Sequence, residues 1–216
     1  MSQVTRPNRT GLPGKQGMYD PALEHDACGF GFIANIHNQP SHEIVNQALQ
    51  IVVNMDHRGA VGADPLAGDG AGILIQTPDK FMRKEFAAQG IEVPAMGDYA
   101  VGMVFLPRDQ KVRDAGIDAI NRVTMAEGQI VLGWRDVPVD NSVLGESVKP
   151  NEPVIKQVLI ARGPNTPDTD AFDRKLYVIR KQSHHLIWDA DDTAWQNFYM
   201  PSLSSRRIVY KGLVLA

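Results

Sequence analysis

The stretch Cys28-Gly-Phe-Gly-Phe-Ile-Ala-Asn-Ile36 decides the fold class, because it is the first segment of the chain suited to burial in a sheet. It combines small residues with aromatic and β-branched ones, which predicts a strand buried on at least one face. Its glycines would leave room for a close neighbour beside the strand. A turn at 37–40 ends the strand, and Ser41 is suited to cap a following helix.

The helix after this turn is expected to extend through about Met55. Glu43 lies in its first turn, where a negative charge is favourable. The apolar residues recur at the spacing of one helical face, which predicts an amphipathic helix packed on the strand 28–36. The face consists of Ile44, Val45, Ala48, Leu49, Val52 and Met55.

The rest of the chain alternates further strands and helices without a strict βαβ period. This irregular order favours a layered α+β sheet fold over a doubly wound parallel one. Pro- and Asp-rich stretches at 138–153 and 163–170 predict loops. The expected strands are 72–76, 99–106, 129–137, 154–161 and two short ones within 198–214. The expected helices are 79–89, 109–127 with the stripe Val112, Ala119, Ile120 and Val123, and one whose face holds Phe172, Leu176, Ile179 and Ser183.

The composition indicates a single domain, or part of a larger one, that binds a small or neutral partner. The chain has 216 residues and is 43% hydrophobic, enough to bury a core. A net charge of −3 without blocks of like charge argues against nucleic acid and against an anionic membrane surface. No apolar run approaches the roughly 20 residues that a membrane-spanning helix needs.

The first 27 residues form a polar leader. They hold three Pro, three Gly and balanced charge, with no apolar core of the kind that a secretory signal requires. The chain also has a single Cys, so an intramolecular disulfide is impossible and the reducing cytoplasm is the expected location.

The single cysteine, Cys28, has two interpretations. A lone cysteine is commonly a small buried hydrophobe. However, Cys28 directly follows the polar leader, so removal of residues 1–27 would make it the first residue. Its free amine, with an ordinary pKa of about 8, could then serve as the base for its own thiol, whose ordinary pKa of about 8.5 leaves it mostly protonated at neutral pH. No separate catalytic histidine would be needed.

Four sequence motifs carry a resemblance to a known family. They are Tyr19-Asp-Pro-Ala-Leu-Glu-His-Asp-Ala-Cys-Gly-Phe-Gly31, Asp56-His-Arg-Gly-Ala60, Gly68-Asp-Gly-Ala-Gly-Ile73 and Ser204-Ser-Arg-Arg-Ile-Val-Tyr-Lys-Gly212. The first three resemble the start of glutamate synthase large subunits, which carry a class II glutamine amidotransferase domain, and the fourth is similar to a later segment of the same domain. The resemblance implies an N-terminal-nucleophile hydrolase fold, a four-layered αββα sandwich. It also implies a propeptide at 1–27, followed by the N-terminal part of the domain at 28–216.

The resemblance implies roles for three residues. Cys28 matches the nucleophile, and Arg58 with Gly59 matches the segment that lines its pocket. Without the resemblance, an arginine after an amphipathic helix would be read as a residue that complements the helix end. The glycine run 68–72 has the wrong spacing for a dinucleotide-binding loop, so a tight loop near the active site is expected instead.

The implied reaction is hydrolysis of glutamine to glutamate and ammonia, with the ammonia passing to a separate flavin site that converts 2-oxoglutarate to glutamate. FMN and an iron–sulfur cluster are implied for the full-length parent only; within this chain neither a cofactor nor a metal site is expected. The implied partners are the remainder of the large subunit and a small NADPH-oxidising subunit.

Two family elements have no counterpart in the 216 residues: the arginine segment that holds the glutamine α-carboxylate and the Asn-Gly pair of the oxyanion hole. The chain alone is therefore expected to be a truncated domain without useful activity, since one oxyanion donor is worth roughly 2.7 to 4 kcal/mol. Two alternatives stay open, namely another N-terminal-nucleophile amidohydrolase and a non-catalytic scaffold fragment in which Cys28 only packs.

Overall fold

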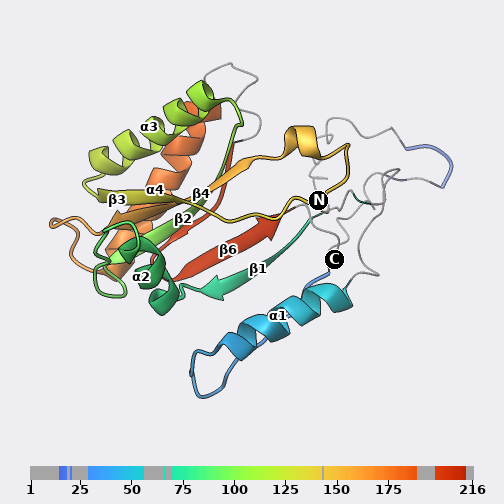
Figure 1. Cartoon of the computed structure of the whole chain (residues 1–216), viewed down its shortest axis with the longest axis horizontal. Coiled ribbons are helices and arrows are strands. Elements are labelled where there is room, and N and C mark those ends of the chain that lie inside the picture. Colours follow the sequence, from blue (N-terminus) through green and yellow to red (C-terminus); the bar gives the residue numbers. More distant parts are fainter. Residues whose placement is uncertain are drawn as a thin grey trace, which may run out of the picture.

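The computed structural model describes residues 15–18, 20, 29–55, 66, 70–142, 144–188 and 198–212, and it contains helices and strands in an irregular order (Figure 1). The helices are α1 (His42–Asn54), α2 (Asp79–Ala87), α3 (Gln110–Ala126), the short 3₁₀ helix η3 (Lys149–Asn151) and α4 (Thr169–Trp188). The strands are β1 (Ala71–Gln76), β2 (Tyr99–Leu106), β3 (Ile130–Asp136), β4 (Val154–Ala161), β5 (Tyr199–Ser204) and β6 (Arg207–Gly212).

The strands of the described residues form two antiparallel sheets. One has four strands in the order β3-β4-β2-β5, and the other has two strands, β1 and β6. All eight residues of β2 are buried, as expected for an inner strand covered on both faces. The predicted α+β class with a layered sheet is confirmed.

Helices α3 and α4 cover one face of the four-stranded sheet (Figure 1). Their apolar faces interdigitate with side chains from β2 and β4, forming the larger of two hydrophobic clusters. Three of the four residues predicted for the α3 face, Ala119, Ile120 and Val123, are buried, and the fourth, Val112, is partly buried. All four residues predicted for α4 are buried, namely Phe172, Leu176, Ile179 and Ser183.

The opposite face of the four-stranded sheet carries the second cluster. Tyr99, Val101, Met103 and Phe105 of β2 pack here against Met82 and Phe86 of α2 and Ile208 of β6. The two-stranded sheet therefore lies beneath the four-stranded one, and α1 lies against β1 on the far side (Figure 1). From one side to the other, the layers are α3 with α4, the four-stranded sheet, the two-stranded sheet with α2, and α1.

Local sequence signals account for the helix boundaries. Ser41 caps α1 by accepting a hydrogen bond from the Ile44 backbone N–H, and Asp109 caps α3 by accepting one from the Val112 N–H. The expected bounds of β2 and β4 are reproduced residue for residue, and the two short strands near the end of the chain are β5 and β6. None of the helices within the described ranges is both long enough and apolar enough to cross a membrane.

The strand predicted at 28–36 is the main error of the sequence interpretation. Cys28 lies outside the described residues, and 29–36 form an extended but irregular segment that no described strand pairs with. Phe30, Phe32 and Ile36 are 87%, 83% and 91% exposed. A strand is stabilised by its neighbours, and the pattern of side chains cannot supply the hydrogen-bonding partner on which it depends.

Candidate active site

The three residues proposed for the site, Cys28, Arg58 and Gly59, lie outside the described residues. Their nearest described neighbours in sequence are Gly29, directly after the cysteine, and Met55, three residues before the arginine. The structure therefore places only the segments that adjoin these positions.

Residues 29–41 and α1 form a hairpin. At its closed end, Asn35 accepts hydrogen bonds from the backbone N–H groups of His37, at 2.8 Å, and Asn38, at 3.0 Å. Towards its open end, Gly31 lies against Ile51 in the last turn of α1, so closely that a Cβ on Gly31 would be 2.6 Å from Ile51 Cγ2. Gly29 and Met55, the described residues nearest in sequence to Cys28 and Arg58, therefore both lie at the open end of the hairpin.

The open end of this hairpin lies beside one end of the two sheets (Figure 1). β1 begins there and β6 ends there, with Ala71 opposite Gly212. In the four-stranded sheet, Leu106 pairs with Val154 and Phe105 with Tyr199, so β2 ends at the same place where β4 and β5 begin. The positive Lys211 Nζ lies 4.8 Å from the centre of the Tyr199 ring and connects the two sheets at this end. We call it the candidate-site end.

Gly70, the described residue directly before β1, has a backbone conformation typical of a tight loop. Gly70 has a φ of +98°, which L-residues with a side chain rarely adopt. A Cβ on Gly72 would be 2.5 Å from the Tyr210 carbonyl oxygen, so only glycine allows this approach. The glycine run 68–72 leads into a strand, as predicted, and residues 67–69 lie outside the described ranges.

The long loop between β3 and β4 also reaches the candidate-site end. The predicted loop 138–153 contains only the short helix η3 among its described residues. Its Gly145 N–H donates to the Leu66 carbonyl at 3.4 Å, and Arg108 Nη1, just after β2, donates to the Lys149 carbonyl at 2.6 Å. Within the loop, the Ser142 hydroxyl and backbone N–H lower the pKa of the Asp140 carboxyl. The loop therefore contacts the segment that follows α1.

A buried polar network lies between the two sheets near the candidate-site end, and the sequence interpretation missed it. Arg135 of β3 is only 6% exposed; it donates to Gln157 of β4 and to Glu85 of α2, each at 2.6 Å. Gln157 in turn donates to the Tyr210 hydroxyl of β6 at 3.3 Å, and the Arg135 guanidinium lies 5.5 Å from the Phe81 ring centre. The sequence signal that could have revealed this network is an arginine in β3 and a glutamine in β4, two strands that are mostly apolar.

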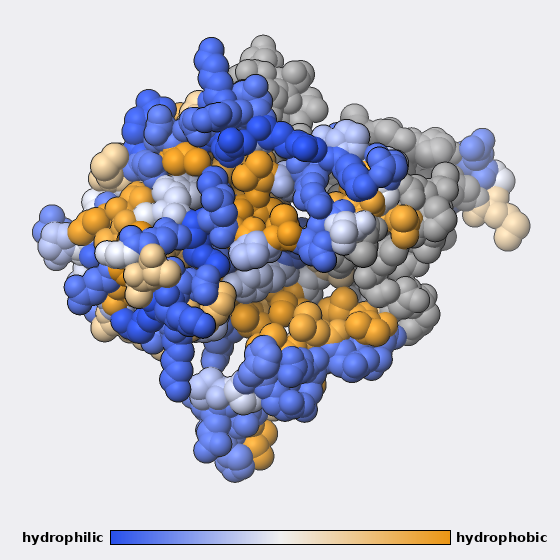
Figure 2. Space-filling model, viewed as in Figure 1, coloured by the Kyte–Doolittle hydropathy of each residue, from blue (hydrophilic) through white to orange (hydrophobic). Residues whose placement is uncertain are grey.

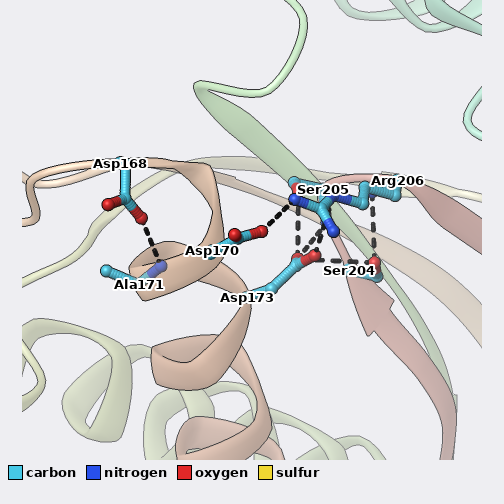
Figure 3. Close-up of polar contacts among 7 residues, drawn as sticks. All are labelled: Asp168, Asp170, Ala171, Asp173, Ser204, Ser205 and Arg206. Carbon is cyan, nitrogen blue, oxygen red and sulfur yellow. Dashed lines mark hydrogen bonds and ion pairs between the residues drawn. The ribbon is translucent and has the colours of Figure 1, made fainter.

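The Ser204-Ser205-Arg206 motif lies at the opposite end of the sheets, in the turn between β5 and β6 (Figure 3). Asp173 of α4 accepts from the Ser205 N–H at 3.0 Å and from its hydroxyl at 2.9 Å. Arg206 forms ion pairs with Asp173, at 3.5 Å, and with Asp170. This motif therefore attaches the β5–β6 turn to the first turns of α4, away from the candidate-site end.

The described histidines lie in two separate places. His37 and His42 lie at the closed end of the hairpin, and His184 and His185 lie in the last turns of α4. Within the residues that the structure describes, no group of three or more His, Cys, Asp or Glu could hold a metal ion.

Comparison with known proteins identifies the family. The family model of the class-II glutamine amidotransferases matches residues 28–216. The chain belongs to this family. The resemblance to glutamate synthases is also confirmed. The chain is 44% identical over 203 residues to the glutamate synthase [NADPH] large chain of Bacillus subtilis, and the match covers 94% of this chain.

The names of two further relatives specify other electron donors. The chain is 45% identical to a glutamate synthase [NADH] of Schizosaccharomyces pombe, over 93% of its length. It is 40% identical to the ferredoxin-dependent glutamate synthase 2 of Synechocystis, over 88%. The chain spans only 13%, 10% and 12% of the length of these three relatives, so it corresponds to a small part of each.

Proposed function

We propose that this chain is the glutamine-hydrolysing part of a glutamate synthase, with Cys28 as the nucleophile after removal of residues 1–27. The observation that carries the proposal is that the family match begins at Cys28 itself, the only cysteine of the chain. The hairpin supports the proposal, because Gly29 and Met55, the described residues nearest in sequence to Cys28 and Arg58, lie together at its open end. The layer order fits an αββα sandwich of the N-terminal-nucleophile hydrolase type.

The proposed reaction starts with the terminal amine of Cys28, which takes the thiol proton. The thiolate attacks the side-chain carboxamide carbon of glutamine, and the proton passes to the departing nitrogen, which leaves as ammonia. Water then hydrolyses the γ-glutamyl thioester, which releases glutamate and restores the thiol. An amine and a thiol with ordinary pKa values of about 8 and 8.5 are well matched for this transfer at neutral pH.

Arg58 and Gly59 are proposed to shape the glutamine pocket. An arginine offers a planar fork of donors that lysine cannot reproduce. Arg58→Lys is therefore expected to raise KM for glutamine in the parent enzyme while the reactivity of Cys28 towards a small alkylating agent stays unchanged. A loss of alkylation in the same variant would instead indicate that Arg58 acts on the nucleophile.

FMN and an iron–sulfur cluster are proposed to belong to the remainder of the parent. Clusters are held by several cysteine thiolates, and this chain has a single cysteine, so its residues do not fit such a group. The relatives name NADPH, NADH and ferredoxin as donors although this portion is similar in all of them. The donor, and any small NADPH-oxidising subunit, is thus proposed to be selected outside this chain. The single cysteine favours the reducing cytoplasm as the location.

The test is covalent labelling of the full-length parent with a diazoketone analogue of glutamine. Intact-mass measurement should show that residues 1–27 are absent, and peptide mapping should place one added label on Cys28. Cys28→Ser should abolish both the label and ammonia release from glutamine. A parent that keeps residues 1–27 while hydrolysing glutamine, or that is labelled elsewhere, would refute the proposal. A panel of other amides separates a glutaminase from another amidohydrolase.

A further inference from the structure

Helix α4 has an outer face that differs from an ordinary solvated helix surface. Its inner face, with five buried residues, packs on the four-stranded sheet. Successive residues are rotated by about 100°. Seven residues consequently fall on one arc opposite the buried side. One of them, Asp170, is paired with Arg206. We call the other six the α4 outer face: Arg174, Tyr177, Lys181, His184, His185 and Trp188.

The α4 outer face presents large aromatic side chains to solvent. Tyr177 is 61% exposed and Trp188 is 57% exposed. His184 stacks on the Trp188 indole, with ring centroids 4.8 Å apart and planes inclined by 16°. This contact orders an exposed tryptophan before any partner arrives. Tyrosine, tryptophan and arginine are the residues that most often dominate the binding energy of protein interfaces.

The same face is positively charged in a chain whose net charge is −3. Arg174 and Lys181 are exposed on it. Among the described carboxylates beside this face, Asp170 pairs with Arg206, and Glu127 binds both Lys175 and Gln182. An acidic partner would therefore meet complementary charge on the face.

Two shallow hollows border the α4 outer face. One lies beside Arg174 and Lys175 and is closed by Thr166 and Pro167. The other, of about 370 Å³, lies beside Lys181 and His185 and is closed by Gln182 and Leu186. Each combines apolar lining with a basic side chain at its rim. Such hollows can receive apolar side chains while neighbouring carboxylates pair with the basic groups.

We propose that the α4 outer face docks an acidic segment with apolar side chains, located in the part of the parent large subunit beyond these 216 residues. The proposal rests on the proposed function only in assigning the chain to such a parent, of which comparable relatives are about seven to ten times longer. In this arrangement the aromatic residues supply the buried contact, and Arg174 and Lys181 set the orientation of the segment.

Zero-length coupling of amines to carboxylates with a carbodiimide in the full-length parent tests the proposal, because it records only pairs in direct contact. Lys181 should couple to an Asp or Glu outside residues 1–216. Lys111 on α3, also exposed, is the matched control and should not. The proposal is overturned by coupling of Lys181 only within the chain, for example to Asp189, Asp191 or Asp192. Absence of Lys181 coupling, or equal coupling of Lys111, also overturns it.

A charge reversal next to Lys181 sharpens the test without removing the reactive amine. Arg174→Glu should lower the yield of the Lys181 coupling at least severalfold, whereas Arg122→Glu on α3 should leave it unchanged. Ammonia release from glutamine is measured in the same samples. If Lys181 does not couple while glutamine is hydrolysed normally, the docking surface is rejected and the proposed function stands. If Cys28 is not labelled while Lys181 couples as expected, the proposed function is rejected and the docking surface stands.

Discussion

Helices α1 and α4 carry similar amphipathic patterns and are packed very differently. Five residues of α4 are buried, whereas α1 has none. Leu176 of α4 is 0% exposed, and Leu49 of α1 is 48% exposed. Figure 2 shows a band of hydrophobic surface between α1 and the rest of the molecule, with hydrophilic surface along the outward side of the helix. Amphipathicity creates an apolar face, but the amount of burial depends on what that face meets.

The largest expected difference comes from the same substitution in both helices. Leu176→Ala should lower the free energy of unfolding by about 2–5 kcal/mol, because it leaves a cavity between α4 and the four-stranded sheet. Leu49→Ala should change it by at most about 0.5 kcal/mol, since the side chain already contacts solvent. Chemical denaturation followed by tryptophan fluorescence measures both. Equal costs would show that α1 is packed as tightly as α4.

The second prediction concerns two buried serines of the packed region. The Ser205 hydroxyl donates to the Asp173 carboxylate, whereas the Ser183 hydroxyl, within α4, has no hydrogen-bond partner among the described residues. Ser205→Ala should lower the free energy of unfolding by about 1.5–3 kcal/mol, the range for hydrogen bonds to charged groups. Ser183→Ala should be neutral or stabilising, because it removes an unsatisfied polar group from the core. Denaturation curves measure the free energy of unfolding of both variants. A clear loss of stability in Ser183→Ala would contradict the description of its hydroxyl as unsatisfied.

The helix caps provide a third comparison. Asp109 Oδ1 accepts from the Val112 N–H at 2.9 Å, whereas Ser41 Oγ accepts from the Ile44 N–H at 3.4 Å. Asp109→Ala should lower the free energy of global unfolding by about 1 kcal/mol. Ser41→Ala should have a smaller global effect and should mainly speed amide hydrogen exchange within α1, because a helix without buried residues opens locally. Faster exchange throughout β2 in the Ser41 variant would argue against such local opening.

The smallest expected effect is a pH dependence confined to the packed region. A hydrogen bond from Lys175 lowers the pKa of Glu127 below its ordinary value of 4.5, with a further contribution from Gln182. The stabilisation from the ionised carboxylate is therefore present above pH 4.5 and is lost as the pH falls through the lowered pKa of the folded state. Glu127→Gln should flatten the pH dependence of unfolding below pH 4.5. An unchanged slope would show that the carboxylate titrates normally.

Sequence patterns predicted the packed region well, because its signals are local. The cap at Asp109, the uninterrupted apolar run of β2 and the helical spacing of Phe172 and Leu176 each specify their element without knowledge of distant residues. Gly70 likewise fits the predicted tight loop. The sequence interpretation failed at 29–36, where the predicted strand depends on a neighbour that lies far away in the chain or outside the described residues.

The candidate site could be predicted only in part for the same reason. The sequence by itself determined the family, through motifs that include Cys28 and Arg58, and the boundaries of most helices and strands, since these depend on neighbouring residues. Only the tertiary structure decided that Arg135 connects two sheets through Gln157, that Ser205 attaches a turn to α4, and that the hairpin opens towards one end of the sheets. Each of these features joins residues far apart in sequence, and no local pattern records which distant side chains will meet.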